Sequence, residues 1–316
     1  MRPFAYSRPR TLEDALGLLQ DSARPLAGGT DLLTLMKADL ATPERLVAVR
    51  SLLPAGIAQE PEGVTLGAGT TLHEIEQDAL VAARFGALAQ AAAAAASAQL
   101  RNMATLGGNL LQRPRCWYFR NAQVQCWLKG GSACPARDGE NRLHALFGES
   151  PCVAVHPSDL ASALLAFDAA VRVRGKAGER SIPLGAFFAV PSEGRRVETR
   201  LGEDELILSV NMPSPPAETR SVYLKAMDRQ AFSFALVGVA AVLRPSHARI
   251  VLSGVAPIPW RAEGAERVLL GAPPSEEVFE RAADAAVAGA TPLRHNAWKI
   301  PLVKALVRRA LKALGR

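Results

Sequence analysis

The spacing of hydrophobic residues in the first fifty positions predicts a small βαβ unit. Leu12, Leu16 and Leu19 recur at helical spacing, and Thr11 lies where a helix N-cap is expected, so we predict an amphipathic helix over residues 11–20. Short apolar runs and turn residues then predict a strand, a second helix and a second strand, over residues 24–27, 31–38 and 45–49.

The middle of the chain alternates between predicted helices and strands. A second unit begins at the GVTLGAG run of residues 63–69, and the alanine-rich segment 72–98 is predicted to be largely helical. A further helix and two strands are predicted over residues 161–167, 170–174 and 206–212. Pro213 ends the last strand, and Ser214-Pro215-Pro216 is predicted to be a linker.

The C-terminal part combines a few strands with helices. An apolar stretch over 233–243 and a strand over 249–253 precede a mostly helical segment. The last helix has a basic face and an apolar face, formed by Ile300, Val303, Leu306, Val307, Ala310, Leu311 and Leu314. Basic amphipathic helices also lie on membrane surfaces, but this one lacks the large aromatic side chains typical of that role. We therefore expect it to pack on its own domain.

Composition narrows the class of protein. The chain has 316 residues, 49% of them hydrophobic, which suits two or three packed subdomains. The net charge of +7 includes no long basic block, so we expect no nucleic-acid partner. The first nine residues hold no apolar signal-peptide segment, and the longest apolar run, 235–243, is too short to span a bilayer. We therefore expect a soluble protein without membrane insertion.

Two glycine-containing turns are the first candidate binding features. Gly28-Gly29-Thr30 lies between a predicted strand and a predicted helix, and the segment 105–109 has the same character. Glycine permits positive φ and close approach of a ligand, and N–H groups at a helix start favour an anion such as pyrophosphate. Ordinary strand-to-helix turns have a similar composition, and the GxGxxG pattern is absent here. The residues alone leave both interpretations open.

All four cysteines, Cys116, Cys126, Cys134 and Cys152, lie in one segment. Their spacing, C-x9-C-x7-C-x17-C, differs from that of zinc ribbons, zinc fingers and ferredoxins. Free thiols, disulfides and a metal centre are all compatible with this clustering, although the lack of an export signal disfavours disulfides. Nearby cations and aromatic rings would offset the charge of a thiolate-bound cluster and shield it from water. These residues are Arg113, Arg115, Trp117, Tyr118, Phe119, Arg120, Trp127, Lys129 and Arg137.

Five features, taken in order, resemble those of a known family. They are LAGGTDLL at residues 26–33, TLGGN at 105–109, Pro157-Ser158-Asp159, the strand at 205–209 and the segment around Lys225. Together they resemble the FAD-binding subunit or domain of the xanthine dehydrogenase and aldehyde oxidoreductase family, over essentially the whole chain. The resemblance implies an α+β fold of the vanillyl-alcohol oxidase (PCMH) type in two subdomains, then a C-terminal domain of a small sheet and helices. The implied boundaries are 1–55, 56–213 with the cysteine loop at 113–152, and 217–316.

The same resemblance assigns residues to FAD. The first turn would hold the pyrophosphate, and Thr105, Gly108 and Asn109 would hold the second side of the cofactor. Lys225 would lie near the isoalloxazine ring, where a cation stabilises the reduced flavin. The implied FAD-binding residues are Leu26, Ala27, Gly28, Gly29, Thr30, Asp31, Leu32, Leu33, Thr34, Thr105, Gly108, Asn109, Asp159, Ile207 and Lys225. From the residues alone, Asp159 is interpreted as a helix N-cap and Lys225 as a solvated side chain.

The cysteine segment resembles a further family feature. RCWYFR at 115–120 and KGGSACPA at 129–136 are similar to the [4Fe–4S]-bearing loop in flavin subunits of periplasmic aldehyde oxidoreductases and of 4-hydroxybenzoyl-CoA reductase. The resemblance implies that Cys116, Cys126, Cys134 and Cys152 bind a [4Fe–4S] cluster.

The expected function is that of an FAD-binding electron-transfer subunit in a heterotrimeric, molybdenum-containing aldehyde oxidoreductase. The implied partners are a molybdenum-cofactor subunit and a [2Fe–2S] subunit, with electrons passing through FAD to an external acceptor. Substrate oxidation would occur on a partner, so we assign no catalytic residue to this chain. A self-sufficient FAD-dependent oxidase and a non-enzymatic metal-binding module are the alternatives. The expected location is cytoplasmic, or periplasmic if a partner carries the export signal.

Overall fold

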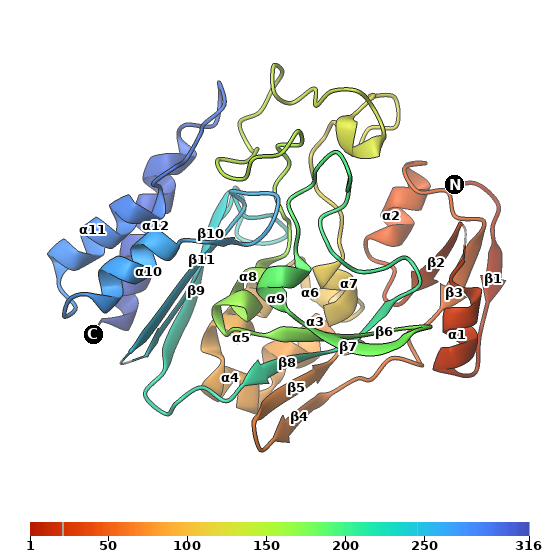
Figure 1. The fold of residues 1–316 in the computed structure, drawn as a ribbon, viewed down its shortest axis with the longest axis horizontal. Helices are drawn as coiled ribbons and strands as arrows, with labels where there is room; N and C mark the ends of the chain where they lie inside the picture. Colours follow the sequence, from red (N-terminus) through yellow and green to blue (C-terminus); the bar gives the residue numbers. More distant parts are fainter. Residues whose placement is uncertain (21, 245, 316) are drawn as a thin grey trace.

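The structure, a computed structural model, describes residues 1–20, 22–244 and 246–315. Three β-sheets with packed helices make up this part of the chain (Figure 1). The first sheet is parallel, in the order β1 (Ala5–Ser7), β3 (Arg45–Ala48), β2 (Ala23–Leu26). Its connections contain α1 (Leu12–Leu18) and α2 (Leu32–Lys37). Thr11 caps α1 by accepting a hydrogen bond from the Asp14 backbone N–H. The parallel pairing of β2 and β3, joined through α2, confirms the predicted βαβ unit.

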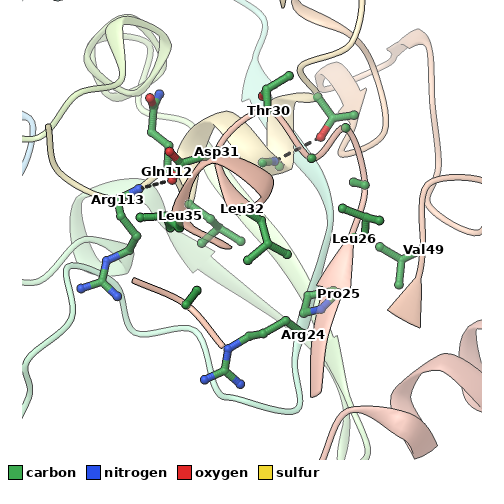
Figure 2. A pocket seen from close by; sticks show the side chains of 18 of the residues that line it. Arg24, Pro25, Leu26, Thr30, Asp31, Leu32, Leu35, Val49, Gln112 and Arg113 are labelled. Carbon is green, nitrogen blue, oxygen red and sulfur yellow. Dashed lines mark hydrogen bonds between the residues drawn. The ribbon is translucent and has the colours of Figure 1, made fainter. Parts of the chain in front are cut away.

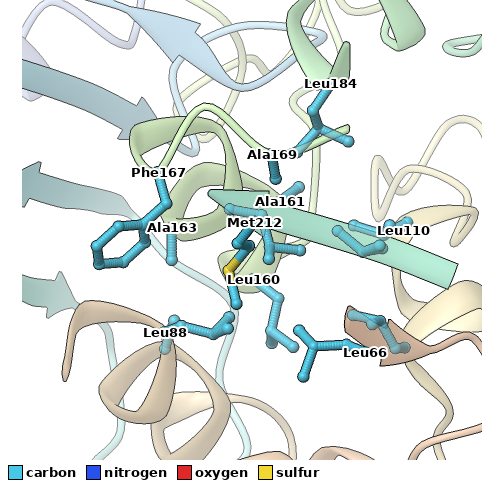
Figure 3. Close-up of a cluster of buried hydrophobic side chains, with 14 of the residues drawn as sticks. Leu66, Leu88, Leu110, Leu160, Ala161, Ala163, Phe167, Ala169, Leu184 and Met212 are labelled. Atoms are coloured by element: carbon cyan, nitrogen blue, oxygen red, sulfur yellow. The ribbon is translucent and has the colours of Figure 1, made fainter. Parts of the chain in front are cut away.

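The second sheet has five strands and carries the main core. Its order is β4 (Ile57–Glu60), β5 (Gly63–Gly67), β8 (Leu206–Pro213), β6 (Ala170–Gly175), β7 (Gly178–Pro183), with antiparallel neighbours. The helices α5 (Gly86–Ala94) and α8 (Asp159–Ala166) pack on it. Figure 3 shows Leu66 and Met212 of the sheet together with Leu88 of α5 and Leu160 of α8 in this core.

The third sheet lies toward the C-terminus. It is antiparallel, in the order β12 (Trp260–Arg261), β11 (His247–Ser253), β10 (Val237–Arg244), β9 (Arg220–Ala226). One face contacts α5 and α8, so these helices are shared with the second sheet. The other face is covered by α10 (Glu263–Leu270), α11 (Glu276–Ala286) and α12 (Lys299–Leu314), at the left of Figure 1. This mixed architecture, with a C-terminal sheet and helices, agrees with the prediction.

The cysteine segment between residues 111 and 158 is mostly irregular. It contains a short 3-10 turn, η1 (Trp127–Lys129). Its buried residues pack on Leu35 of α2 and on Leu293, which precedes α12. Figure 1 shows the segment running between α2 and the C-terminal helices. The segment therefore connects the N-terminal unit with the C-terminal domain.

Two predicted elements differ in the structure. TLGGN does not form a turn, because Leu106–Leu110 is the short helix α7, capped by Thr105. The segment 72–98 is divided among several helices, because the Asp78 side chain accepts a hydrogen bond from Val81 N–H and starts a new one. The helices of this region are α3 (Leu72–Gln77), α4 (Ala79–Arg84), α5 and α6 (Ala98–Arg101), and α9 (Leu184–Phe187) follows later in the chain.

The last helix, α12, packs on its own domain, as predicted. Its buried apolar positions are Val303, Leu306, Val307, Ala310, Leu311 and Leu314. Its basic side chains form ion pairs of 2.6–2.7 Å with acidic residues of α11, namely Lys304–Asp284, Arg308–Glu280 and Lys312–Glu276. Within the described ranges, no helix is long and apolar enough to cross a membrane.

We expect Leu306→Ala to lower the free energy of unfolding by roughly 2–4 kcal/mol, because it leaves a cavity beneath α12. Urea unfolding followed by circular dichroism measures the change. Arg309→Ala, on the exposed side of the same helix, is the matched control and should change stability by less than about 0.5 kcal/mol. Equal effects of the two substitutions would contradict the packing described here.

Candidate functional site

A cavity of about 610 Å³ lies between the N-terminal unit, α7 and the start of β8. Ten predicted FAD-binding residues line it: Leu26, Ala27, Gly28, Gly29, Thr30, Asp31, Leu32, Thr105, Gly108 and Ile207. Figure 2 shows the side chains of Leu26, Leu32 and Val49 around this space. The cavity brings the two glycine motifs, which are far apart in the sequence, to one place.

The first glycine motif depends on glycine for its backbone shape. Gly29 has a φ of +71°, which L side chains rarely adopt. A Cβ at Gly28 would lie 2.1 Å from the carbonyl oxygen of Met103, so only glycine lets this turn approach the segment before α7. Gly28 therefore lets the turn lie directly against the residues that precede the second motif.

The glycines of the second motif have different roles. A Cβ at Gly107 would lie 3.2 Å from the Cβ of Ala68, so this glycine serves close packing. Gly108 lines the cavity, and outside the backbone of α7 a Cβ there would meet only Thr105 Oγ1, at 3.1 Å, among described atoms within 4 Å. Gly108 thus leaves the start of α7 open to a ligand.

The Asp31 carboxylate connects the cavity with the cysteine segment. Its Oδ1 lies 2.9 Å from Nη2 of Arg115 and 2.8 Å from Nη2 of Arg120. Its Oδ2 accepts a hydrogen bond of 2.8 Å from the backbone N–H of Arg113 (Figure 2). These contacts with the Asp31 carboxylate therefore hold the cysteine segment against α2.

Five predicted FAD-binding residues lie outside the cavity lining: Leu33, Thr34, Asn109, Asp159 and Lys225. Thr34 Oγ1 donates a hydrogen bond of 2.6 Å to the Asp31 carbonyl. Asn109 Oδ1 accepts a hydrogen bond of 2.5 Å from Ser158 Oγ, which ties α7 to the start of α8. The side chains of Thr34 and Asn109 therefore form hydrogen bonds within the protein.

Asp159 and Lys225 form a buried ion pair of 2.8 Å, with side chains 5% and 2% exposed. The Tyr223 hydroxyl donates to the other carboxylate oxygen at 2.6 Å, and Lys225 Nζ also donates to the Ala94 carbonyl at 2.9 Å. Burial raises the pKa of Asp159, while Lys225 opposes this shift. Ser158, not Asp159, caps α8, and Lys225 is not solvated, so both interpretations made from the residues alone are wrong.

The sequence interpretation missed part of the cavity wall. Val49 and Leu53 follow β3, which runs parallel to β2, so they reach the same sheet edge as the first glycine motif. Arg113 and Phe119 come from the cysteine segment, with the guanidinium 5.0 Å from the ring centroid. The parallel pairing was the one signal that could have located Val49. The other missed lining residues are Ser22, Arg24, Pro25, Leu35, Leu40, Ala41, Thr42, Pro43, Gly107, Leu111, Gln112 and Leu206.

The four cysteines lie together as free thiols, three of them buried and Cys116 partly exposed. Burial raises the pKa of Cys116 to about 11. The close approach of Cys134 and Cys152 lowers the pKa of the first thiol and raises that of the second. In the part of the chain that the structure describes, no group of three or more His, Cys, Asp or Glu could hold a single metal ion.

Buried polar side chains of the C-terminal domain hold the cysteine segment in place. Asn296 Nδ2 donates to the carbonyls of His144 and Ala145, at 3.1 and 2.9 Å. Lys299 Nζ donates to the carbonyls of Leu143 and His144, at 3.2 and 3.1 Å. Burial lowers the pKa of Lys299 to about 7. These contacts fix the backbone between the third and fourth cysteines.

Comparisons with known proteins cover nearly the whole chain. Residues 2–215 match the FAD binding domain in molybdopterin dehydrogenase, and residues 222–314 match the CO dehydrogenase flavoprotein C-terminal domain. The aldehyde oxidoreductase FAD-binding subunit PaoB of Escherichia coli is 38% identical over 96% of each chain. The carbon monoxide dehydrogenase medium chain of Hydrogenophaga pseudoflava is 31% identical, over 98% of this chain and 96% of the relative. A solved structure of carbon monoxide dehydrogenase from that organism gives a TM-score of 0.79 at 29% identity, covering 99% of this chain and 97% of the other.

The fold, the cavity and these matches define a flavoprotein subunit of the molybdenum hydroxylase class. The chain belongs to the family of FAD-binding subunits of xanthine dehydrogenase and related molybdenum hydroxylases, and it is part of an oxidoreductase complex. The resemblance inferred from the sequence motifs is therefore confirmed.

Proposed function

We propose that this chain is the FAD-binding electron-transfer subunit of a heterotrimeric, molybdenum-containing aldehyde oxidoreductase. It would receive electrons from [2Fe–2S] centres on one partner, downstream of a molybdenum-cofactor partner, and deliver them to an external acceptor. The observation that carries the proposal is the cavity of about 610 Å³ that joins both glycine motifs. The 38% identity to an aldehyde oxidoreductase subunit favours aldehydes as the substrate class. Bound FAD would supply conversion between two-electron and one-electron transfer.

The chain's own residues would bind and orient the cofactor. The turn from Leu26 to Thr34 and the start of α7 offer backbone N–H groups and glycine surfaces suited to pyrophosphate. Apolar walls would exclude water, and Ile207 at the start of β8 would supply a backbone contact. The family resemblance supports a role in FAD binding also for Asn109, Asp159 and Lys225.

Purification of the chain with its partners tests this function. We expect a complex of three different subunits in which an aldehyde, added without oxygen, bleaches the flavin absorption. A flavin reduced by substrate in the isolated chain would instead indicate a self-sufficient oxidase. A chain that never binds flavin would indicate a non-enzymatic module.

We further propose that Cys116, Cys126, Cys134 and Cys152 bind a [4Fe–4S] cluster. Their thiols pack together with the buried rings of Phe119 and Trp127, and these rings would shield the iron–sulfur cluster from water. Each thiolate of such a cluster binds a different iron, so the sulfurs surround the cluster and need not converge on one point. The donor set therefore suits this cofactor, although no single-ion site is formed among the described residues.

Protein purified without oxygen should contain about four irons and four acid-labile sulfides per chain. Cys126→Ser should lower both contents severalfold, because it removes a buried ligand. Ser132→Ala, at an exposed position of the same segment, is the matched control and should leave both unchanged. Chemical analysis of iron and sulfide measures the result. One equivalent of zinc without sulfide would contradict the assignment.

We also propose the domain division inferred from the sequence, with FAD-binding subdomains at 1–55 and 56–213 and a C-terminal domain at 217–316. Each of the three sheets in the described residues falls within one of these ranges, which supports the division. The helices α5 and α8, packed between the second and third sheets, would then form the contact between neighbouring domains.

A further inference from the structure

We infer that His144 is a positioning residue that donates an N–H···S hydrogen bond to the Cys116 sulfur and thereby raises the reduction potential of the [4Fe–4S] cluster. This inference rests on the cluster proposed above. No sequence motif singled out His144, which lies between the third and fourth cysteines.

The geometry places the imidazole directly at the sulfur. His144 Nε2 lies 3.2 Å from Cys116 Sγ, well within the range of a hydrogen bond to sulfur. The His144 residue is 2% exposed, so little of the ring is open to solvent. Cys116 is the least buried of the four cysteines, and this contact covers one side of its sulfur.

Contacts of the His144 backbone and of its ring hold the imidazole at the Cys116 sulfur. The His144 backbone N–H donates to the Asn141 carbonyl at 2.9 Å, and its carbonyl accepts from Asn296 and Lys299, each at 3.1 Å. The ring packs edge-on against Trp117, with centroids 5.2 Å apart. The backbone is therefore fixed, and a rotation of the ring away from Cys116 would break its packing on Trp117.

The two ring nitrogens differ in their surroundings, which selects the tautomer. Nδ1 of His144 is buried without a hydrogen-bond partner among the described residues. A hydrogen on Nδ1 would therefore leave a buried donor unpaired, and burying an unpaired donor is unfavourable. A hydrogen on Nε2 is directed at the Cys116 sulfur, and a cluster-bound thiolate can only accept. The neutral ring thus carries its hydrogen on Nε2.

This hydrogen bond has a consequence for the cluster. Reduction adds negative charge to the iron–sulfur unit, including its thiolate ligands. An N–H group aimed at one ligand stabilises the reduced form more than the oxidised form, so it raises the potential. The backbone carbonyl of His144 is held by Asn296 and Lys299 of the C-terminal domain. The reduction potential would therefore depend on how that domain holds the cysteine segment.

Redox titration of the anaerobically purified complex, followed by electron paramagnetic resonance, tests the inference. His144→Phe keeps an aromatic ring but removes the donor, and should lower the midpoint potential with iron and sulfide contents unchanged. His144→Gln places an amide donor near the same position and should restore much of the shift. His295→Phe is the control, because His295 faces Glu140 at 3.7 Å, and should not change the potential.

A second measurement does not require that His144→Phe retains its iron–sulfur cluster. With 15N-labelled histidine, pulsed electron paramagnetic resonance spectra of the reduced wild type should show a weak coupling between the cluster and a histidine nitrogen. His144→Gln should remove this coupling. Absence of this coupling, or equal potentials in the wild type and a fully loaded His144→Phe, would overturn the inference while leaving the cluster intact. A wild type without iron would instead overturn the cluster proposal itself.

Discussion

Gly108→Val is expected to weaken FAD binding by about 100-fold or more, equivalent to about 2.7 kcal/mol. Gly108 lines the cavity, and the added side chain would occupy the space beside α7 that the cofactor is proposed to use. The fold should tolerate the change with a small shift of the Thr105 hydroxyl, because outside the backbone of α7 a Cβ there would meet only Thr105 Oγ1, at 3.1 Å, among described atoms within 4 Å. Flavin content per chain and titration of the flavin-free protein with FAD measure the effect.

Two further glycine variants separate cofactor loss from misfolding. Gly108→Ala adds a single methyl group and should weaken FAD binding much less, with thermal stability maintained. Gly28→Ala should instead lower stability, because its Cβ would lie 2.1 Å from the Met103 carbonyl oxygen. Full flavin occupancy in Gly108→Val would show that the start of α7 does not contact the cofactor.

The N-terminal unit could be predicted because its signals are local. The Thr11 cap and the helical spacing of Leu12, Leu16 and Leu19 are contained within one segment, and the structure confirms α1 and its cap. TLGGN was wrongly predicted as a turn, because two adjacent glycines usually disfavour a helix. The Thr105 cap and the packing of Gly107 on Ala68 outweigh that preference.

Several strands could not be predicted because their sequences carry no apolar alternation. The strands β4 and β7 lie at the edges of the second sheet, and most of their side chains are exposed. Their positions are set by hydrogen bonds to β5 and β6, which only the folded chain supplies. The strands β1, β9 and β12 were missed as well, since each is short or only partly buried.

The glycine motifs of the candidate site could be predicted, but the polar network near α8 could not. Tyr223 and Lys225 lie two residues apart on β9 and therefore point to the same face. That face meets Asp159 at the start of α8, 66 residues from Lys225 in the sequence. Neither residue alone indicates a buried ion pair, because the pairing depends on how β9 and α8 pack.

Replacement of Lys225 by Met should lower the free energy of unfolding by about 3–5 kcal/mol, because it leaves the Asp159 carboxylate buried without its cation. The variant keeps the length of the side chain, so little packing is lost. Denaturant unfolding of the flavin-free protein measures the change, since the loss of cofactor then makes no contribution. Tyr223→Phe removes one hydrogen bond to the same carboxylate and should have a smaller effect, about 1.5–3 kcal/mol.

The double variant Asp159→Asn/Lys225→Met shows whether the loss comes from the unpaired charge. It should recover much of the stability, because no buried charge remains. The single variant should also depend on pH. Burial raises the pKa of Asp159, and removing Lys225 raises it further. A carboxyl whose pKa is higher in the folded state binds more protons there, so its folded form gains stability as the pH falls. The loss in free energy of unfolding caused by Lys225→Met should therefore be smaller at pH 5 than at pH 8. An equal loss at both pH values would show that the lost contacts of the lysine, not the carboxylate charge, cause the instability.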